Sequence, residues 1–381
     1  MTFEELKLSK PLIETLEISF KEPTKIQVAA IPAILSGANV IGQAPTGTGK
    51  TLAYLLPIFE KIDAASSNVQ ALILSPTYEL VMQTARVGQE LWKNLEGQLE
   101  VELNDSTKMN RIEFRTLGLI GGSNINRQIE ALKKKKPQII SASAGRIIEL
   151  SRKNKLNLMN LKFLVLDEFD RLLDKQNLIT IKEVIKLLPK DIQILMFSAT
   201  ATKKALEQSK EFGTFNLIKV DEDLTFAAER QNFYRQVEFH KKVSEVRKLT
   251  RRFSITRGLV FINNKFSAVD MLGKLRYDGI KAESLISSSD KMSRKKAIAD
   301  FKAGKIQLLL STDLAARGLD IENIDYVINL DFPENAQMYL HRAGRTARAG
   351  AEGKVITLVD RKEMHKIKEL ETALNINFQQ L

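Results

Sequence analysis

The chain has 381 residues, of which 44% are hydrophobic and 27% charged, a composition typical of a soluble globular protein with two or three domains. It contains no cysteine, which excludes disulfides and cysteine-bound metals, and its three histidines lie too far apart in sequence for a metal-ligand pattern. Lysine and arginine number 58 against 46 for aspartate and glutamate, so the net charge of +12 fits either a polyanionic partner or ordinary solubility charge.

Short apolar runs recur along the chain, and each stops at a polar or glycine-rich cluster. Such runs begin at residues 39, 71, 138, 163 and 194, and again at residues 258, 307, 326 and 354. They are short and uniformly apolar, which is typical of parallel strands buried on both faces. Amphipathic segments of helix length lie between them, such as Lys50 to Ile62 and Ser293 to Lys302. This alternation predicts α/β domains, each built on a doubly wound parallel sheet.

The two series of runs predict two domains, at residues 1–209 and 232–381, joined by a linker region at 210–231. No run reaches the ~18 apolar residues needed to span a bilayer, and the first residues lack a leader-like apolar segment, so we expect a soluble cytoplasmic protein. The low-complexity run Lys133–Lys136 is better explained as a solvated helix end than as a dedicated nucleic-acid contact.

The sequence APTGTGKT follows the first predicted strand and precedes a predicted helix. A strict phosphate-loop pattern has glycine where this chain has Ala44, yet the other requirements are met. Two glycines let backbone amides surround a phosphate chain, Lys50 offers a charge to the β and γ phosphates, and the Thr51 hydroxyl suits Mg²⁺. The predicted nucleotide-binding residues of this loop are Ala44, Thr46, Gly47, Thr48, Gly49, Lys50 and Thr51.

The sequence FLVLDEFDRLLD, residues 163–174, places two carboxylates at the end of an apolar strand. A site for Mg²⁺ and a nucleotide needs a carboxylate from a neighbouring strand, and Asp167 is placed for that role beside Thr51. Glu168 is placed to polarise the water that attacks the γ phosphate. Alternatively, both carboxylates cap the next helix. With no N-K-x-D run to indicate a GTPase, we predict an NTP hydrolase rather than a dehydrogenase.

From about Phe3 to Leu358 the chain resembles the DEAD-box RNA helicases of superfamily 2. Two further motifs carry this resemblance, STDLAARGLD at 311–320 and HRAGRTARAG at 341–350, while DEFD stands in place of DEAD at 167–170. The resemblance implies two tandem RecA-like domains with the nucleotide site in the cleft between them. It also implies an ATP- and Mg²⁺-dependent enzyme that binds RNA and unwinds short duplexes or remodels RNA–protein complexes as a monomer.

The resemblance implies roles for residues outside the phosphate loop. In FKEPTKIQ, Phe20 would stack on adenine and Gln27 would bond its edge, with Phe3 as an upstream aromatic, although both phenylalanines could simply be core residues. Asp320 would reach the ribose. The catalytic residues would be Lys50, Asp167, Glu168 and two arginine fingers, Arg345 and Arg348.

Further residues would couple ATP to RNA or contact the RNA backbone, with little base readout. The coupling residues implied are Ser198, Thr200, His341, Phe169 and Asp170. The RNA-binding residues implied are Thr77, Gln83, Gly121, Gly122, Gly145, Arg146, Thr312 and Arg294.

Departures from the family pattern fall mainly on the RNA side. Tyr78 replaces arginine, Ser143-Ala144 replaces Thr-Pro, and Lys291 replaces glutamine. Phe169 replaces alanine beside the carboxylates, where its bulk either crowds the link to Ser198–Thr200 or is absorbed by compensating changes. We therefore carry two alternatives to the helicase: an ATP-gated RNA clamp that unwinds poorly, and a DNA motor of the same superfamily.

Overall fold

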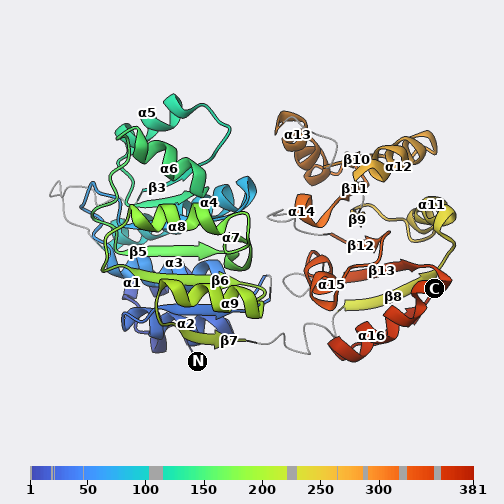
Figure 1. The fold of residues 1–381 in the computed structure, drawn as a ribbon, viewed down its shortest axis with the longest axis horizontal. Helices are drawn as coiled ribbons and strands as arrows, with labels where there is room; N and C mark the ends of the chain where they lie inside the picture. Colours follow the sequence, from blue (N-terminus) through green and yellow to red (C-terminus); the bar gives the residue numbers. More distant parts are fainter. Residues whose placement is uncertain are drawn as a thin grey trace. The chain divides into compact units, whose positions relative to one another are not determined.

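Two seven-stranded parallel sheets, each with helices on both faces, organise the described chain (Figure 1). The computed structural model describes residues 2–18, 20, 22–45, 47–102, 115–220, 230–263, 265–285, 291–316, 324–346 and 353–381. The chain divides into a first unit, Met1–Asp221, and a second unit, Glu222–Leu381, with one sheet in each. The predicted pair of doubly wound α/β domains is therefore confirmed.

The first sheet has the strand order β3-β4-β2-β5-β6-β1-β7. Its strands are β1 (Val40–Gln43), β2 (Ala71–Leu74), β3 (Thr116–Leu119), β4 (Ile139–Ala142), β5 (Phe163–Asp167), β6 (Gln193–Ser198) and β7 (Asn216–Lys219). One face is covered by α1 (Lys10–Glu17), α2 (Lys25–Leu35), α3 (Lys50–Lys61) and α4 (Tyr78–Glu102), with the short η1 (Glu4–Leu6). The other face is covered by α5 (Ile125–Lys135), α6 (Ala144–Arg152), α7 (Phe169–Leu172), α8 (Leu178–Lys186) and α9 (Lys203–Ser209), followed by η2 (Lys210–Phe212).

Strand β5 shows how the two hydrophobic cores of the first unit are separated. Phe163 and Val165 pack into the core with α1–α4, whereas Leu164 and Leu166 pack into the core with α5–α9. Because side chains alternate along a strand, Asp167 belongs on the face of Val165, toward α3. The sheet therefore directs this carboxylate to the helix that follows the phosphate loop.

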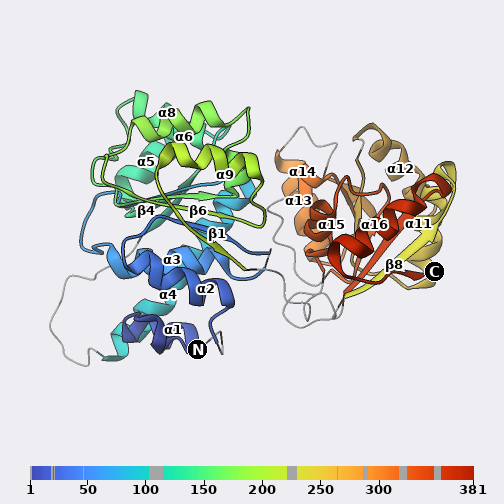
Figure 2. The same ribbon diagram turned by 60° about the horizontal axis from the view of Figure 1, so that its bottom comes forward.

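The second sheet has the order β10-β11-β9-β12-β13-β8-β14. Its strands are β8 (Arg230–Gln236), β9 (Gly258–Phe261), β10 (Ala282–Ser284), β11 (Leu308–Ser311), β12 (Tyr326–Asn329), β13 (Gly353–Val359) and β14 (Gln379–Gln380). One core joins it to α13 (Lys291–Lys302), α14 (Asp313–Ala316), α15 (Ala336–Ala343) and α16 (Met364–Leu374). The other joins it to α11 (Lys242–Arg252) and α12 (Lys265–Tyr277), and η3 (Phe239–Lys241) and η4 (Arg361–Glu363) are single turns. Figure 2 shows α15 and α16 beside each other on one face of this sheet.

All nine predicted strands are present, but the predicted linker began too early. Strand β7 pairs in parallel with β1, so residues 216–219 belong to the first sheet. This strand is mostly exposed and so lacks the apolar run that marked the others. Residues 221–229 of the predicted linker lie outside the described part of the chain.

Two further features concern the lysine run and the apolarity of the helices. The lysines of Lys133–Lys136 are exposed at the carboxyl end of α5, as expected for a solvated helix end. Among the helices that the structure describes, none is long and apolar enough to cross a membrane.

Candidate nucleotide and RNA sites

The turn between β1 and α3 has the backbone geometry of a phosphate-binding loop. Gly47 and Gly49 have φ angles of 83° and 85°, a left-handed conformation that glycine accepts without steric cost. A Cβ atom at Gly49 would also lie only 2.5 Å from the side-chain nitrogen of Gln27. Helix α3 begins at Lys50, so its positive end faces the loop. Thr46 lies outside the described residues.

Lys50 is held within the loop by neutral acceptors. Its Nζ atom lies 2.6 Å from the carbonyl oxygens of both Ala44 and Pro45. The Thr48 hydroxyl donates to the same Pro45 carbonyl at 2.7 Å. Because hydrogen bonds between two charged groups are stronger than those to a neutral carbonyl, a phosphate can displace these partners from the lysine.

Asp167 supplies the carboxylate that the sequence predicted beside the loop. Its side chain is buried, and burial, followed by the neighbouring charge of Glu168, raises its pKa to about 7, while Lys50 acts in the opposite direction. A divalent cation would offset both causes of this shift, so these oxygens fit Mg²⁺. No group of three or more His, Cys, Asp or Glu side chains in the described residues could hold a metal.

Glu168 has an unusual backbone conformation. With φ 55° and ψ 51° it is left-handed, which costs a residue other than glycine about 1–3 kcal/mol and is frequent at functional sites. It occupies the N-cap position of α7 but makes no side-chain capping hydrogen bond. The helix-capping alternative for this carboxylate is therefore not supported.

The link from the carboxylates to β6 is intact despite Phe169. Asp170 accepts a 2.6 Å hydrogen bond from the Ser198 hydroxyl and a second, short one from the Thr200 hydroxyl. Phe169 is fully buried in the core with α8, alongside Ile181. Its bulk is thus absorbed by the core, and the expected crowding of the link is not observed.

The implied RNA-binding residues of the first unit follow three neighbouring strands. Thr77 follows β2, Gly121 and Gly122 follow β3, and Gly145 lies in the first turn of α6, after β4. The Gly121 amide donates to the Ser143 hydroxyl at 3.1 Å. The buried Arg146 donates to the Ser123 carbonyl at 2.9 Å and pairs with Glu149, and Gln83 lies on α4.

The carboxyl ends of the parallel strands lie along one edge of the first sheet, the carboxyl edge, and this edge is divided in two. The predicted nucleotide residues follow β1 and β5, the predicted coupling residues Ser198 and Thr200 follow β6, and the predicted RNA residues follow β2, β3 and β4. In the strand order these sets occupy separate stretches that meet where β2 pairs with β5. Ligands of open α/β sheets bind at this edge, so the two predicted sites are neighbours.

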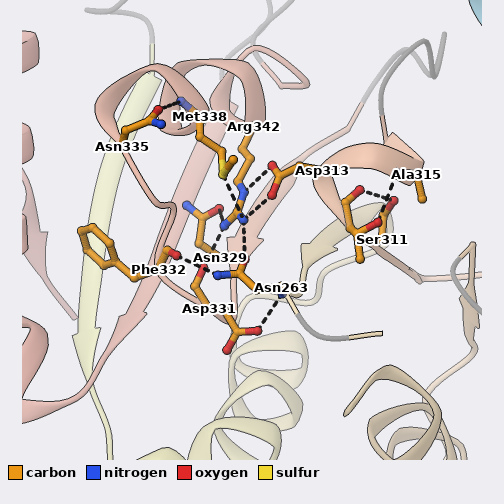
Figure 3. A network of polar contacts seen from close by, with 11 residues as sticks. Asn263, Ser311, Asp313, Ala315, Asn329, Asp331, Phe332, Asn335, Met338 and Arg342 are labelled. Carbon is orange, nitrogen blue, oxygen red and sulfur yellow. Dashed lines mark hydrogen bonds and ion pairs between the residues drawn. The ribbon is translucent and has the colours of Figure 1, made fainter. Parts of the chain in front are cut away.

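In the second unit, a buried arginine that sequence reasoning did not assign organises the carboxyl edge (Figure 3). Arg342 is fully buried and donates from Nε and Nη2 to the two carboxylate oxygens of Asp313, at 2.8 and 2.6 Å. It also donates to the Asn263 side chain at 2.7 Å and the Asp331 carbonyl at 2.8 Å. Its guanidinium carbon lies 5.0 Å from the centre of the Phe261 ring. The signal for it was its position beside His341 in the HRAGR sequence.

The other predicted residues of the second unit lie near this network in sequence. Thr312 precedes Asp313, and its hydroxyl accepts a 3.2 Å hydrogen bond from the Ala315 amide, whose carbonyl accepts one from Arg294 at 2.7 Å. His341 is half-buried on α15 and Arg345, just beyond it, is buried. Asp320 and Arg348 lie outside the described residues.

Comparisons with known proteins agree with this arrangement. Residues 24–209 match the DEAD/DEAH box helicase family, and residues 241–350 match the helicase conserved C-terminal domain. The chain is 38% identical over 363 residues to DEAD-box ATP-dependent RNA helicase CshC of Bacillus cereus, covering 94% of this chain and 87% of that protein. It is 39% identical over 358 residues to the probable ATP-dependent RNA helicase YfmL of Bacillus subtilis, covering 94% and 90%. The chain belongs to the DEAD-box helicase family.

Solved structures give the same fold. Saccharomyces cerevisiae Dbp5, bound to RNA and ADP BeF3, aligns with a TM-score of 0.82 and 28% identity, covering 100% of this chain and 95% of that chain. The DEAD-box helicase Mss116, bound to ssRNA and UDP-BeF, aligns with a TM-score of 0.81 over 100% of this chain and 79% of that one. At 24% identity the second likeness supports the fold alone. The implied tandem RecA-like domains are therefore confirmed.

The predicted adenine-binding segment of this DEAD-box chain contacts the predicted phosphate loop directly. The buried Gln27 accepts a hydrogen bond from the Thr24 amide at 2.9 Å and donates one to the Gly49 carbonyl at 3.2 Å. Phe20 is 47% exposed, so the explanation as a core aromatic fails for it, whereas it holds for the buried Phe3. The position of Phe20 is thus compatible with stacking on a ligand. Tyr78, where the family has arginine, is also exposed, at the start of α4.

Proposed function

We propose that the protein is an RNA-stimulated ATPase that separates short RNA duplexes or remodels RNA–protein complexes, working as a monomer in the cytoplasm. The observation that carries this proposal is the divided carboxyl edge of the first sheet, where predicted ATP residues and predicted RNA residues meet between β5 and β2. Relatives that match nearly the whole chain are named ATP-dependent RNA helicases, which supports the same activity.

In this proposal the residues of the phosphate loop bind and orient ATP. Lys50 exchanges its carbonyl partners for oxygens of the β and γ phosphates, while Phe20 and Gln27 hold the adenine. When bound at Thr51 and Asp167, Mg²⁺ neutralises phosphate charge. Other contacts come from the Ala44, Thr46, Gly47, Thr48 and Gly49 backbone and from Asp320 at the ribose.

Hydrolysis then follows from the placement of charge. Glu168 orients a water molecule, whose oxygen bonds to the γ phosphorus as the bond to the β–γ bridging oxygen breaks. Negative charge on the transferred group is stabilised by Lys50 and by two arginines of the second unit, Arg345 and Arg348. The proton of the water leaves toward the Glu168 side, and ADP keeps the bridging oxygen.

Coupling to RNA follows from linkage between two ligands. RNA binds by its backbone to Thr77, Gln83, the glycines at 121, 122 and 145, and Arg146, with Thr312 and Arg294 from the second unit. Ser198, Thr200, Phe169, Asp170 and His341 couple these contacts to the nucleotide. If ATP and RNA favour the same conformation of the protein, each must increase the affinity of the other. A conformation that binds one bent strand excludes a duplex, so ATP binding separates strands locally.

A second candidate is an ATP-gated RNA clamp with slow hydrolysis. The exposed Tyr78 favours it, because a tyrosine replaces the positive charge that the family places near the RNA backbone. Duplex release at saturating ATP separates this candidate from the helicase.

The test is steady-state ATP turnover with and without single-stranded RNA at near-physiological salt, with Glu168→Gln as the blank. We expect RNA to stimulate turnover several-fold, single-stranded DNA to compete poorly, and the blank to be inactive. RNA affinity should fall with salt, with a log–log slope of ~0.7 for each neutralised phosphate. Turnover that RNA leaves unchanged, despite ATP binding, would overturn the ATPase proposal in favour of the clamp, and equal stimulation by DNA would favour a DNA motor.

A further inference from the structure

A buried tyrosine, Tyr54, lies where the two halves of the carboxyl edge meet. It is on the second turn of α3, its side chain is fully buried, and its ring packs 5.4 Å from the centre of the Phe197 ring. Its hydroxyl lies 3.4 Å from Asp167 Oδ2 and 3.5 Å from the Thr84 hydroxyl, and the Thr51 side chain lies close by. Three polar groups therefore surround one hydroxyl in a position closed to solvent.

These partners belong to different functional segments. Asp167 ends β5 in the nucleotide half, and Thr51 follows Lys50 on the same helix as Tyr54. Thr84 is buried on α4, one residue after Gln83, in the helix that follows β2 and the RNA-binding Thr77. The hydroxyl thus joins the predicted cation site to the helix that carries predicted RNA contacts.

The chemistry of a phenol sets the direction of these hydrogen bonds. A tyrosine hydroxyl carries its proton at neutral pH, because its ordinary pKa is about 10. A tyrosine hydroxyl has one proton to donate and also accepts, and a carboxylate is the strongest acceptor it meets here. The Tyr54 hydroxyl therefore donates its proton to Asp167 and accepts a hydrogen bond from the Thr84 hydroxyl.

We propose that Tyr54 is a positioning residue that holds the Asp167 carboxylate toward the cation site and connects it to α4. Both parts rest on the proposed function: the connection to α4 on the proposed stimulation by RNA, and the effect on Asp167 on the proposed cation site. A movement of α4 on RNA binding would reach Asp167 through two hydrogen bonds. Removing the hydroxyl should then weaken both cation binding and the response to RNA, with the ring packing left in place.

The variant is Tyr54→Phe, and the first readout needs neither RNA nor hydrolysis. Binding of a fluorescent ADP analogue is titrated with Mg²⁺ and, separately, with Mn²⁺. Because groups that orient a metal ligand typically contribute 10–100-fold in metal affinity, we expect the apparent cation affinity to fall about tenfold. Affinity for the analogue without cation should stay unchanged. An unaltered cation titration would overturn the proposed role of Tyr54 in cation binding.

The second readout is the factor by which single-stranded RNA stimulates ATP turnover. Both Tyr54→Phe and Thr84→Val should lower this factor several-fold, and the double variant should lower it no further than Tyr54→Phe does. Thr84→Val should leave the cation titration unchanged. Additive losses in the double variant, or no loss in either single variant, would overturn the connection to α4.

A matched control is Tyr339→Phe in the second unit. This tyrosine is equally buried and its hydroxyl donates to Asn232 at 2.6 Å, so it reports the general loss of a buried phenol. It should leave both readouts unchanged, and an equal loss in this control would overturn the assignment to Tyr54. Wild-type turnover without any stimulation by RNA would defeat the proposed function, while the cation titration would still decide the role of Tyr54.

Discussion

Lys50 in the first unit and Arg342 in the second are cations at the carboxyl edges of two similar sheets, but they are held in opposite ways. Lys50 contacts two carbonyl oxygens of its own loop, five and six residues away. Arg342 contacts side chains and backbone from three other segments, of which Asn263 is 79 residues away. These two contacts of the lysine are local and neutral, whereas the arginine has a distant carboxylate and several further acceptors.

This difference separates a predicted ligand-binding cation from a structural one. A phosphate can replace the two carbonyl contacts of Lys50, which are neutral. Removing Arg342 would leave the carboxylate of Asp313 without its bidentate partner in a largely buried place. Arg342 therefore fixes β9, α14 and α15 to one another, and it holds the segment from which Arg345 projects. Membership of the HRAGR motif does not by itself make an arginine a ligand contact.

The largest effect expected from this comparison is on stability. Arg342→Ala should lower the free energy of unfolding of the second unit by about 3–5 kcal/mol, because it breaks a buried ion pair by removing one partner. Urea unfolding followed by circular dichroism measures this loss. The only tryptophan of the chain, Trp92, lies in the first unit, so its fluorescence reports that unit separately.

The control for Arg342 is Arg247→Ala in the same unit. Arg247 pairs with Asp278 at 2.9 Å, but both side chains are about one-third exposed, so the loss should stay below about 1 kcal/mol. Equal losses for the two variants would contradict the distinction drawn here. If Arg342→Ala shifted the transition followed by Trp92 fluorescence as much as the one followed by circular dichroism, the loss of stability would not be confined to the second unit.

Lys50→Ala should show the reverse behaviour. Loss of a preorganised charge at the transferred phosphate lowers turnover by about 10²–10³-fold, while the free energy of unfolding should change by less than about 0.5 kcal/mol. ATP turnover and the same urea curves measure both quantities. Lys61→Ala is the control, because Lys61 is exposed at the other end of α3. A Lys50 variant that unfolded as readily as the Arg342 variant would remove the contrast between the two cations.

Sequence reasoning succeeded where a local pattern reflects burial or a shared edge. The nine predicted strands are buried on both faces, so their residues form apolar runs. Strands β7 and β14 are largely exposed and were missed, and so were β3, β8 and β10, in which glycine or polar residues interrupt the apolar pattern. The phosphate loop and Asp167 were found because parallel strands place the residues after them at one edge.

The residues that were missed depend on contacts between distant segments. Tyr54 lies in the apolar sequence TLAYLLP and resembles a core residue, because only the fold shows that its hydroxyl faces Asp167. The acceptors of Arg342 are spread from Asn263 to Asp331, so no spacing in the sequence marks them. For Phe169 the sequence shows its size but not its direction, and the fold places it in the core rather than against the coupling residues.

The smallest predicted effect concerns Asp167 and pH. Its pKa in the folded protein is about 7, above the usual 3.8, so the folded state binds this proton more tightly than the unfolded state. The free energy of unfolding of the wild type should therefore fall as pH rises from about 4 to about 7 and remain lower above that range. Asp167→Asn cannot ionise and escapes this loss. Without nucleotide, it should equal the wild type near pH 4 and melt at a higher temperature at pH 8.

Thermal unfolding at both pH values, with the exposed Asp191→Asn as control, measures this difference. Adding Mg²⁺ and ADP at pH 8 should reverse the order, because a ligand that binds only the folded state stabilises it in proportion to its affinity, and the variant lacks the carboxylate that fits the cation. This reversal would show that Asp167, like Lys50, is a charged residue positioned for a ligand. Its burial would then destabilise the protein until that ligand is bound. The opposite result would be a wild type that melts at a higher temperature than Asp167→Asn at pH 8 without ligand. The charge of Asp167 would then already be balanced by partners within the fold, as the charge of Arg342 is.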